Sequence, residues 1–311
     1  MPNNIGTSSH NRANTNSMPE SGPPKTASTR HYGRVLATAV TGVVVIAAIY
    51  GAVADRRFQW GIVFHYAFNH QILIGLMITL ELTAISMILG IVLGILLAIM
   101  LRSNLLLVRG ICKTYIWFFR GTPVLVQLIF WYNLAALVPD IGIPGLFSVS
   151  VNSLISPLTA AILGLGLNEG AYMAEVVRAG IVSVDQGQVD AAHSLGMTSR
   201  QVMRYVILPQ ALRVILPPTG NETIGMLKTT SLVSVIAMSE LLYSAQKIYA
   251  VNYEVTPLLI AVSIWYLAAT SVLTACQTRI ERRLARGQSP GSVGGEAGFR
   301  RLRRYGPFAL R

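Results

Sequence analysis

Residues 72–101 read ILIGLMITLELTAISMILGIVLGILLAIML, and Glu81 is the one ionisable side chain among them. About 20 apolar residues in a helix span the hydrocarbon core of a bilayer, so this stretch is long enough to cross it at a tilt. A transmembrane barrel strand would instead alternate polar and apolar residues, and this stretch shows no alternation. The stretch therefore predicts a transmembrane helix and an all-α integral membrane protein.

Five more apolar stretches are long enough to cross a membrane: Val35–Ala54, Pro123–Val138, Leu158–Ile181, Val214–Met238 and Pro257–Thr278. A helix satisfies its own backbone hydrogen bonds in lipid, so each stretch can span as a helix. Only 12% of the 311 residues are charged, whereas soluble domains carry about 25%. The sequence therefore predicts six transmembrane helices and argues against a water-soluble enzyme.

The distribution of Lys and Arg predicts the orientation, because cytoplasmic loops carry an excess of both. With the N-terminus inside, twenty Lys and Arg fall in the cytoplasmic segments, which are 1–34, 102–113, 178–213 and 279–311. Three fall in the external segments, which are 55–71, 139–157 and 239–256. We therefore expect both termini in the cytoplasm. The net charge of +12 sits mainly in tails and short loops, so it does not indicate a nucleic-acid-binding domain.

The two tails have compositions typical of chains that do not fold. Residues 1–34 are rich in Asn, Ser, Thr and Pro, and residues 286–311 are rich in Gly and Arg. Such segments bury too little apolar surface to offset the entropy of ordering. We expect a disordered N-terminal tail and a basic C-terminal tail, both cytoplasmic.

The longest cytoplasmic loop, Asp185–Pro209, reads DQGQVDAAHSLGMTSRQVMRYVILP. Two residue pairs in it have capping-box spacing, which marks the start of a helix: Asp185 with Gln188, and Thr198 with Gln201. Gly196 lies between the pairs and can adopt the left-handed conformation that ends a helix. The loop therefore predicts one short helix ending at Leu195 and a second that runs towards Leu208 and stops at Pro209.

The stretch DAAHSLGM, followed ten residues later by ILP, resembles the cytoplasmic loop of permease subunits of ATP-binding-cassette importers. The pattern in that family is E-A-A, three residues, Gly, and then I-x-L-P. Asp190 stands where Glu is usual, while Ala191, Ala192, Gly196 and Pro209 match.

Four further stretches look like the polar-amino-acid branch of that family, the permeases similar to histidine, glutamine and arginine transporters. They are FFRGTPVLVQ (118–127), LNEGAYMAEVVRAGI (167–181), ILPQALRVILPPTGNE (207–222) and LKTTSLVSVIAMSELL (227–242). The resemblance covers about residues 70–285 and implies a core of five spans. Residues 35–54 are then an additional N-terminal transmembrane helix.

The resemblance implies a multi-pass permease of the cell (inner) membrane that imports polar amino acids. Its loop, with Asp190, Ala191, Ala192, Gly196, Thr198 and Pro209, would transmit movement from a separate ATPase. The implied partners are a dimer of ATPase subunits, a second permease copy or homologue, and an extracytoplasmic amino-acid-binding protein. This sequence has no GxxxxGK[ST] phosphate loop, so ATP and magnesium are expected on the ATPase, with no cofactor in this chain.

Polar residues within the spans are candidates for the substrate path, because an ionisable side chain in the bilayer needs a cavity or a partner. The dipeptide Asn-Glu occurs twice, at Asn168-Glu169 and at Asn221-Glu222, and could bind an α-ammonium group. Interhelical hydrogen bonding is the alternative for both. Lys228 either attracts a substrate carboxylate or forms a structural ion pair with Glu81, Glu169 or Glu222.

Three smaller features have structural interpretations. Glu175 and Arg178 have the spacing of an i,i+3 ion pair. Gly90 and Gly94 form a GxxxG pattern, which favours close contact between helices. Arg120 is interpreted as an anchor at the membrane interface.

Two other classes of protein are alternatives. A secondary transporter or channel would account for the intramembrane charges but not for the loop around Gly196. A membrane-anchored enzyme is less consistent with the sequence, because no nucleophile–base pair is apparent. The two cysteines, Cys112 and Cys276, are too isolated for a metal site.

Overall fold

The computed structural model describes residues 32–143 and 147–285, so both predicted tails lie almost wholly outside the described residues. Two units are present, Met1–Ala54 and Asp55–Arg311. In the first, α1 (Tyr32–Ala54) is a 23-residue helix that contains the apolar stretch predicted from Val35 to Ala54.

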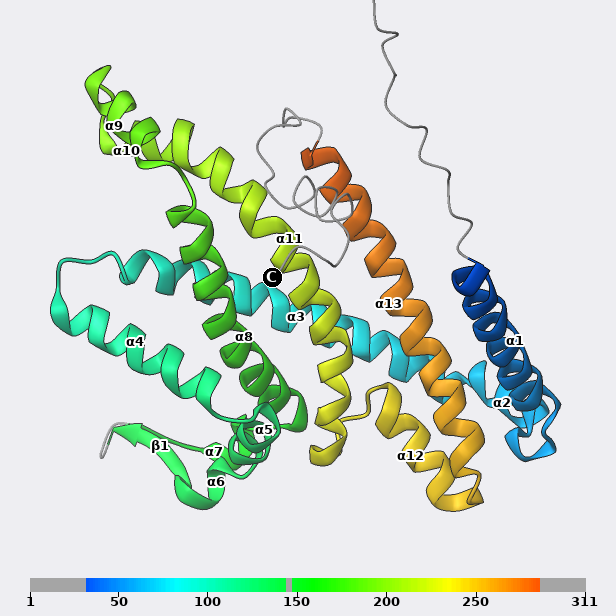
Figure 1. Cartoon of the computed structure of the whole chain (residues 1–311). Coiled ribbons are helices and arrows are strands. Elements are labelled where there is room, and N and C mark those ends of the chain that lie inside the picture. The colour runs from blue at the N-terminus through cyan, green and yellow to red at the C-terminus, as the bar shows by residue number, and fades with distance from the viewer. Residues whose placement is uncertain (1–31, 144–146, 286–311) are drawn as a thin grey trace, which may run out of the picture. The chain divides into compact units, whose positions relative to one another are not determined.

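The second unit contains four long helices (Figure 1). They are α3 (His70–Met100), α8 (Pro157–Val182), α11 (Leu208–Thr229) and α13 (Val255–Ala285). Shorter helices connect them: α2 (Trp60–Ala67), α4 (Leu106–Gly121), α5 (Val124–Tyr132), α6 (Leu134–Leu137), α7 (Val151–Leu154), α9 (Gln186–Ser194), α10 (Ser199–Val202) and α12 (Leu241–Asn252). Two 3₁₀ helices, Arg56–Phe58 and Thr230–Ile236, and a π-helix, Met203–Ile207, complete the helical part of the described chain.

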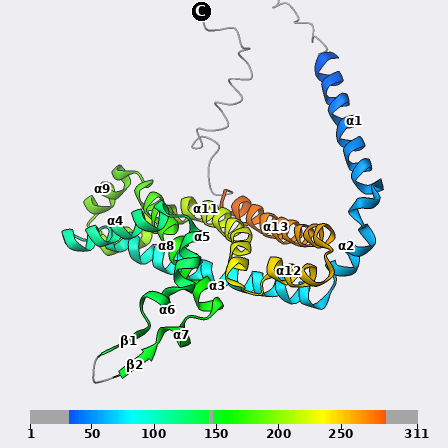
Figure 2. The ribbon, with the colours of Figure 1, turned by 90° about the horizontal axis from the view of Figure 1, so that it is seen from below.

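One antiparallel hairpin lies between α6 and α7. Its strands are β1 (Asp140–Ile143) and β2 (Phe147–Ser150), and Asp140 pairs with Ser150. Seen from below, the hairpin projects away from the long helices of its unit (Figure 2).

Two helices in the described residues are long and apolar enough to cross a membrane, His70–Met100 and Val255–Leu284. A third span is present if Ser199–Ile236 and Leu241–Asn252, which meet at 44°, form one broken span. Glycine and charged side chains make α8 less apolar, although it is 26 residues long. These helices fit insertion into a membrane.

Glycines bring α3 and α8 into close contact. A Cβ atom added at Gly90 would lie 2.5 Å from Cγ of Glu169, and one added at Gly94 would lie 2.5 Å from Cβ of Met173. On the α8 side, two glycines face two leucines: Gly166 faces Leu89 and Gly170 faces Leu93. The GxxxG pattern therefore marks a close helix contact, as predicted.

The stretch Pro123–Val138, predicted as one span, contains two short helices instead. α5 ends at Tyr132, and Asn133 separates it from α6. The Asn133 side-chain amide donates to the Ile129 carbonyl at 2.8 Å, which favours a turn over a continuing helix. The aromatic stretch before Pro123 forms α4, so two helices joined at a proline occupy this part of the chain.

Pro209 does not stop a helix, and this part of the loop prediction was wrong. Met203–Ile207 forms a π-helix that connects α10 to α11 without a break. Proline lacks an N–H, and in a regular α-helix its ring collides with the carbonyl four residues earlier, but the wider turn of a π-helix offsets that carbonyl. Pro209 stands in the first turn of α11, after the wider π-turn. The stretch Val214–Met238 also differs from the prediction, since its α-helix ends at Thr229 and becomes 3₁₀.

The connection between the second 3₁₀ helix and α12 is fixed by a fully buried carboxylate. Glu240 caps α12 by accepting hydrogen bonds from the backbone N–H groups of Leu242 and Tyr243, at 2.8 and 2.7 Å. The Tyr266 hydroxyl of α13 donates to the same carboxylate at 2.9 Å. The bend is therefore hydrogen-bonded to the neighbouring helix.

We predict that Gly94→Ala destabilises the fold by about 1–3 kcal/mol, the usual range for overpacking. The added Cβ would lie 2.8 Å from the backbone carbonyl carbon of Met173, which cannot rotate away. Thermal unfolding of the purified protein in detergent measures the effect. Gly61→Ala in α2 is the control, because nothing lies within 4 Å of its added Cβ. Equal stability of the two variants would contradict the close contact.

Candidate functional site

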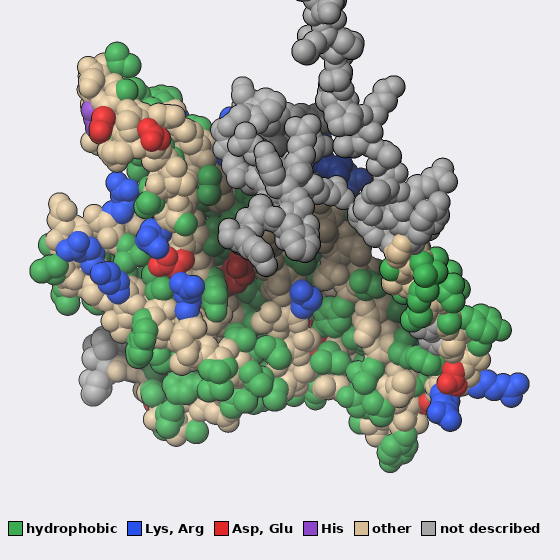
Figure 3. Space-filling model, viewed as in Figure 1, with side chains coloured by type: hydrophobic (Ala, Val, Ile, Leu, Met, Phe, Trp, Pro, Cys, Tyr) green, Lys and Arg blue, Asp and Glu red, His purple; other side chains and the backbone are tan. Residues whose placement is uncertain are grey.

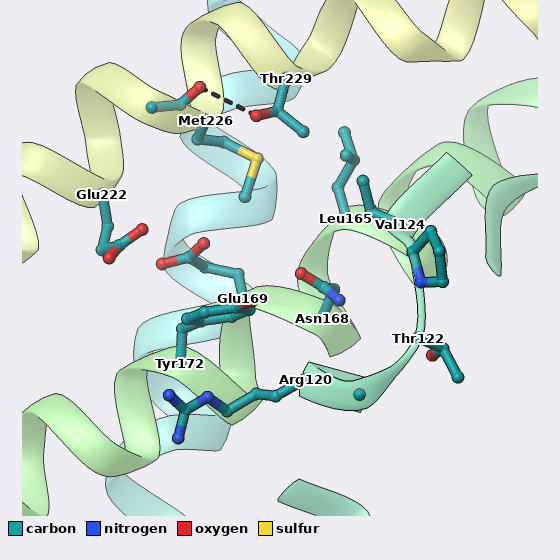
Figure 4. A pocket seen from close by; sticks show the side chains of 13 residues that line it. Arg120, Thr122, Val124, Leu165, Asn168, Glu169, Tyr172, Glu222, Met226 and Thr229 are labelled. Carbon is teal, nitrogen blue, oxygen red and sulfur yellow. Dashed lines mark hydrogen bonds between the residues drawn. The ribbon is translucent and has the colours of Figure 1, made fainter. Parts of the chain in front are cut away.

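A cavity of about 520 Å³ opens between the α4–α5 junction, α8 and α11 (Figure 4). Its walls come from segments that are distant in sequence but packed against one another. They consist of Arg120, Gly121, Thr122, Pro123, Val124, Leu165, Asn168, Glu169, Tyr172, Glu222, Gly225, Met226 and Thr229.

The α4–α5 junction is fixed by hydrogen bonds from side-chain amides. The Gln127 amide donates to the backbone carbonyls of Phe119 and Thr122, at 3.0 and 3.1 Å, and to the Thr122 hydroxyl at 2.7 Å. Asn168 on α8 donates to the Phe119 carbonyl at 2.7 Å. These bonds satisfy carbonyls at the end of α4, and they attach the junction to α8. One wall of the cavity is therefore hydrogen-bonded to the opposite helix.

Two carboxylates face the cavity. Glu169 is only 5% exposed, and its Oε1 atom is buried without a hydrogen-bond partner. Figure 4 shows the carboxylates of Glu169 on α8 and Glu222 on α11 pointing toward each other. A buried polar atom without a partner is unfavourable unless something else binds it. The pair can therefore bind a positively charged group that enters the cavity.

A cation lies on another wall of the same cavity. The Arg120 guanidinium lies over the Tyr172 ring, 5.1 Å from its centroid, in a cation–π contact. Arg120 is exposed. The cavity therefore has a basic side near the end of α4 and an acidic side between α8 and α11.

Arg120, Tyr172 and Thr229 line the cavity but were not predicted from the sequence as site residues. Arg120 was interpreted as an interface anchor, whereas the structure places it in the cavity wall. One signal could have indicated this position, since Arg120 directly precedes the Gly-Thr-Pro sequence that breaks α4 from α5. The contact with Tyr172 depends on tertiary packing, which spacing in the sequence does not show.

Asn221 and Lys228 lie outside this cavity. On an α-helix they are rotated from Glu222 by about 100° and 240°, so they belong to other faces of α11. The Asn221 side-chain carbonyl accepts a hydrogen bond from Gln277 on α13 at 3.1 Å. Lys228 lines a separate pocket with Ser231 and Tyr266.

No ion pair joins Lys228 to Glu81, Glu169 or Glu222 within residues 32–143 and 147–285. The one ion pair of that part of the chain joins Glu175 and Arg178 at 2.5 Å, as the i,i+3 spacing predicted.

The loop between α8 and α11 contains two short helices and a glycine bend. Gly196 has φ +83°, the predicted left-handed conformation. Thr198 and Gln201 form the predicted capping box. Asp185 precedes α9 as predicted, but its side chain makes no capping bond. The side-chain carbonyl of Gln188 instead accepts a hydrogen bond from the side-chain amide of Gln210 at 2.6 Å.

The loop has its own small core and an exposed outer surface. Ala192 is buried together with Val202, Ile207 and Ala211. Asp190 and Ala191 are exposed, and the Asp190 carboxylate accepts a hydrogen bond from Gln186 at 2.9 Å. Leu195, next to the bend, is 84% exposed. The loop is thus a projection with its own packed core and an apolar side chain near its tip.

Comparison with known proteins decides the family. Residues 90–286 match the family described as the inner membrane component of binding-protein-dependent transport systems. The chain belongs to this family. The permease is 40% identical over 262 residues to the arginine transport system permease protein ArgU of Corynebacterium glutamicum, covering 84% of this chain and 83% of the relative. It is 37% identical over 178 residues to the glutamine transport system permease protein GlnP of Escherichia coli, covering 57% and 76%.

Solved structures agree with this assignment. A crystal structure of an amino acid ABC transporter with histidines matches with a TM-score of 0.61 and 38% identity, covering 68% of the permease and 94% of that chain. The MetNI methionine ABC transporter matches with a TM-score of 0.52 and 17% identity, covering 66% and 92%. The second likeness concerns the fold alone.

The described part of the permease contains no group of three or more His, Cys, Asp or Glu side chains that could hold a metal ion. Members of its family are transport components, so we interpret the cavity as a candidate binding site and not as an active site.

Proposed function

We propose that the permease is the membrane subunit of an ATP-driven importer of amino acids. The proposal rests mainly on the cavity, which has Glu169 and Glu222 on one side and Arg120 on another. An α-amino acid carries an ammonium group and a carboxylate close together, so its charges complement this arrangement. The names of the similar proteins, which transport arginine and glutamine, support the same substrate class.

In this proposal the ammonium group binds between Glu169 and Glu222, and the carboxylate binds at Arg120. Hydrogen bonds to charged groups are stronger than neutral ones, so these contacts orient the substrate. Asn168 contributes indirectly, because it holds the α4–α5 junction against α8. The cavity lining has two carboxylates and one guanidinium, so its net charge is negative and favours a substrate that carries an additional positive charge.

The loop of Asp190, Ala191, Ala192, Gly196 and Thr198 is the proposed contact with a separate ATPase. Its left-handed bend at Gly196 and the exposed Leu195 near its tip support this role. The proposed complex contains two ATPase subunits, which bind ATP and magnesium, and a second permease copy or homologue. An extracytoplasmic amino-acid-binding protein delivers the substrate. The permease itself needs no cofactor in this scheme.

We also propose six spans with both termini in the cytoplasm. α1, α3, α8, α11 and α13 each form one span, and the α4–α6 segment forms the other. The surplus of Lys and Arg in segments 1–34, 102–113, 178–213 and 279–311 supports this orientation. In this arrangement α1 is added to a five-span core within 70–285, and the tails 1–34 and 286–311 are cytoplasmic.

Reporter fusions test this topology. A reporter that works only in the cytoplasm should be active when fused after Arg286 and silent when inserted within 139–157, because the basic segments stay inside. The activities of the two fusions are compared at equal protein level. Activity of the insertion within 139–157 and silence of the fusion after Arg286 would invert the orientation.

Gly196 provides a test of coupling. A β-branched residue adopts the left-handed conformation only at a cost of roughly 1–2 kcal/mol, so Gly196→Val should reorient α10 without disturbing the spans. We expect normal permease in the membrane, weak ATPase association and little uptake. Gly196→Asn is the matched control, since Asn tolerates this conformation.

Two results would count against the coupling role. Normal uptake by Gly196→Val would show that the bend at Gly196 is not needed for coupling to the ATPase. Uptake that persists after removal of the ATPase subunit, with the membrane potential intact, would favour the alternative of a secondary transporter or channel.

Removal of a carboxylate tests the cavity. Glu222→Gln should weaken substrate affinity by roughly tenfold or more, because a hydrogen bond to a charged group contributes about 1.5–3 kcal/mol. The concentration dependence of uptake, with competition by a panel of unlabelled amino acids, measures this effect. Glu81→Gln is the control, since Glu81 is exposed on α3 and does not line the cavity. Equal losses in both variants would place the substrate elsewhere.

A further inference from the structure

An apolar groove follows the outer surface of α4, away from the cavity. Only residues of α4 line it, and most are strongly exposed. Leu106 is 77% exposed and Trp117 is 74% exposed. Gly110 and Thr114 form its floor, one helical turn apart. The groove is therefore a strip of small residues between large apolar side chains.

Gly110 has no structural explanation within the chain. Glycine in the interior of a helix is less favourable than alanine by about 0.5–1 kcal/mol, so it usually has a packing or functional reason. Most glycines of α3 and α8 face another helix at close range, whereas a Cβ added at Gly110 meets nothing within 4 Å. Gly225 on α11 is equally open, and it faces the cavity. The open space over Gly110 is therefore available to a molecule outside this chain.

Basic side chains run beside the groove. Arg109 and Lys113 are four residues apart and form the row next to that of Gly110 and Thr114. Neither forms an ion pair with a carboxylate of the described chain, where Glu175–Arg178 is the only such pair. In Figure 3, blue Lys and Arg side chains gather at the left of the view, near the turn from α3 to α4. The groove thus combines an apolar floor with an unpaired positive edge.

We propose that this surface of α4 binds an anionic phospholipid. The phosphate lies at Arg109 and Lys113, and an acyl chain lies in the groove over Gly110. The side of the membrane rests on the proposed orientation, which puts the start of α4 at the cytoplasmic leaflet, where anionic lipids attract basic residues.

A symmetric contact with the α4 of a second copy fits this surface less well. A two-fold contact of α4 with α4 places the same patch on both sides of the interface. It would bring Arg109 and Lys113 close to their own counterparts, and like charges repel. A lipid phosphate neutralises the same charges instead.

Lipid binding to the purified importer complex in a neutral detergent tests the proposal. Dioleoylphosphatidylglycerol and dioleoylphosphatidylcholine are the two probes, and native mass spectrometry counts the bound lipids. We expect the wild-type protein to prefer the glycerol lipid. The double variant Arg109→Gln/Lys113→Gln should lose about tenfold or more of its affinity for that lipid, because each basic residue near an anionic headgroup contributes to attraction. Its affinity for the choline lipid should stay unchanged.

Gly110→Leu tests the groove independently of charge. The leucine side chain occupies open space, so the protein should fold and retain its thermal midpoint, but binding of both lipids at this surface should fall. Gly61→Leu and Arg57→Gln are matched controls, since Gly61 is also open and Arg57 lies outside α4.

Two outcomes overturn the proposal. One is unchanged glycerol-lipid preference in both the charge variant and Gly110→Leu. The other is dissociation of the complex by Gly110→Leu with no change in bound lipid, which would assign the groove to a protein interface. Lipid binding is measured without ATP or amino acid, so failure here leaves the transport proposal unaffected, and failure of transport leaves this one unaffected.

Discussion

The close contact between α3 and α8 is the constraint on which the rest of the permease depends. Gly90 lets the backbone of α3 approach the stem of Glu169, so the same contact that joins the two helices also buries that carboxylate. A larger residue at this position would separate the helices and change the depth of the carboxylate. The charge of the cavity is therefore a consequence of helix packing. The proposed substrate site and the stability of the fold therefore share residues at this contact.

Much of the fold was predictable, because long apolar runs and glycine spacing are local signals. The runs around α3, α8 and α13 were placed correctly, and so were the Gly196 bend and the Thr198 capping box. The predictions were wrong where a helix continues through a residue that usually stops it, and where a helix ends although hydropathy alone predicts that it continues. A π-helix directly before Pro209 lets the helix continue through the proline, and no residue pattern in the sequence predicts a π-helix. At Asn133 a side-chain hydrogen bond ends a helix that hydropathy alone would continue.

The candidate site was predictable only in part. Asn168, Glu169 and Glu222 were identified because polar residues in apolar spans need a reason to be there. Asn221 and Lys228 were grouped with them for the same reason, as polar residues within a span, but they point about 100° and 240° away from Glu222 around the helix. Arg120 was missed because its partner, Tyr172, lies on another helix. Residue type indicated the chemistry of the site, while the direction of each side chain required the structure.

The π-helix after α10 makes the loop and the cavity wall one continuous rod. From Ser199 to Thr229 the rod measures about 46 Å, at 1.5 Å per residue. Gly180 on α8 receives the Ile215 side chain of the rod, which makes this contact a natural fulcrum. The arm from the fulcrum to Ser199 is about 24 Å, and the arm to Glu222 is about 10 Å. A tilt about this fulcrum would move the loop further than Glu222, and Pro217 and Pro218, inside α11 between Ile215 and Glu222, are the positions at which such a rod would bend.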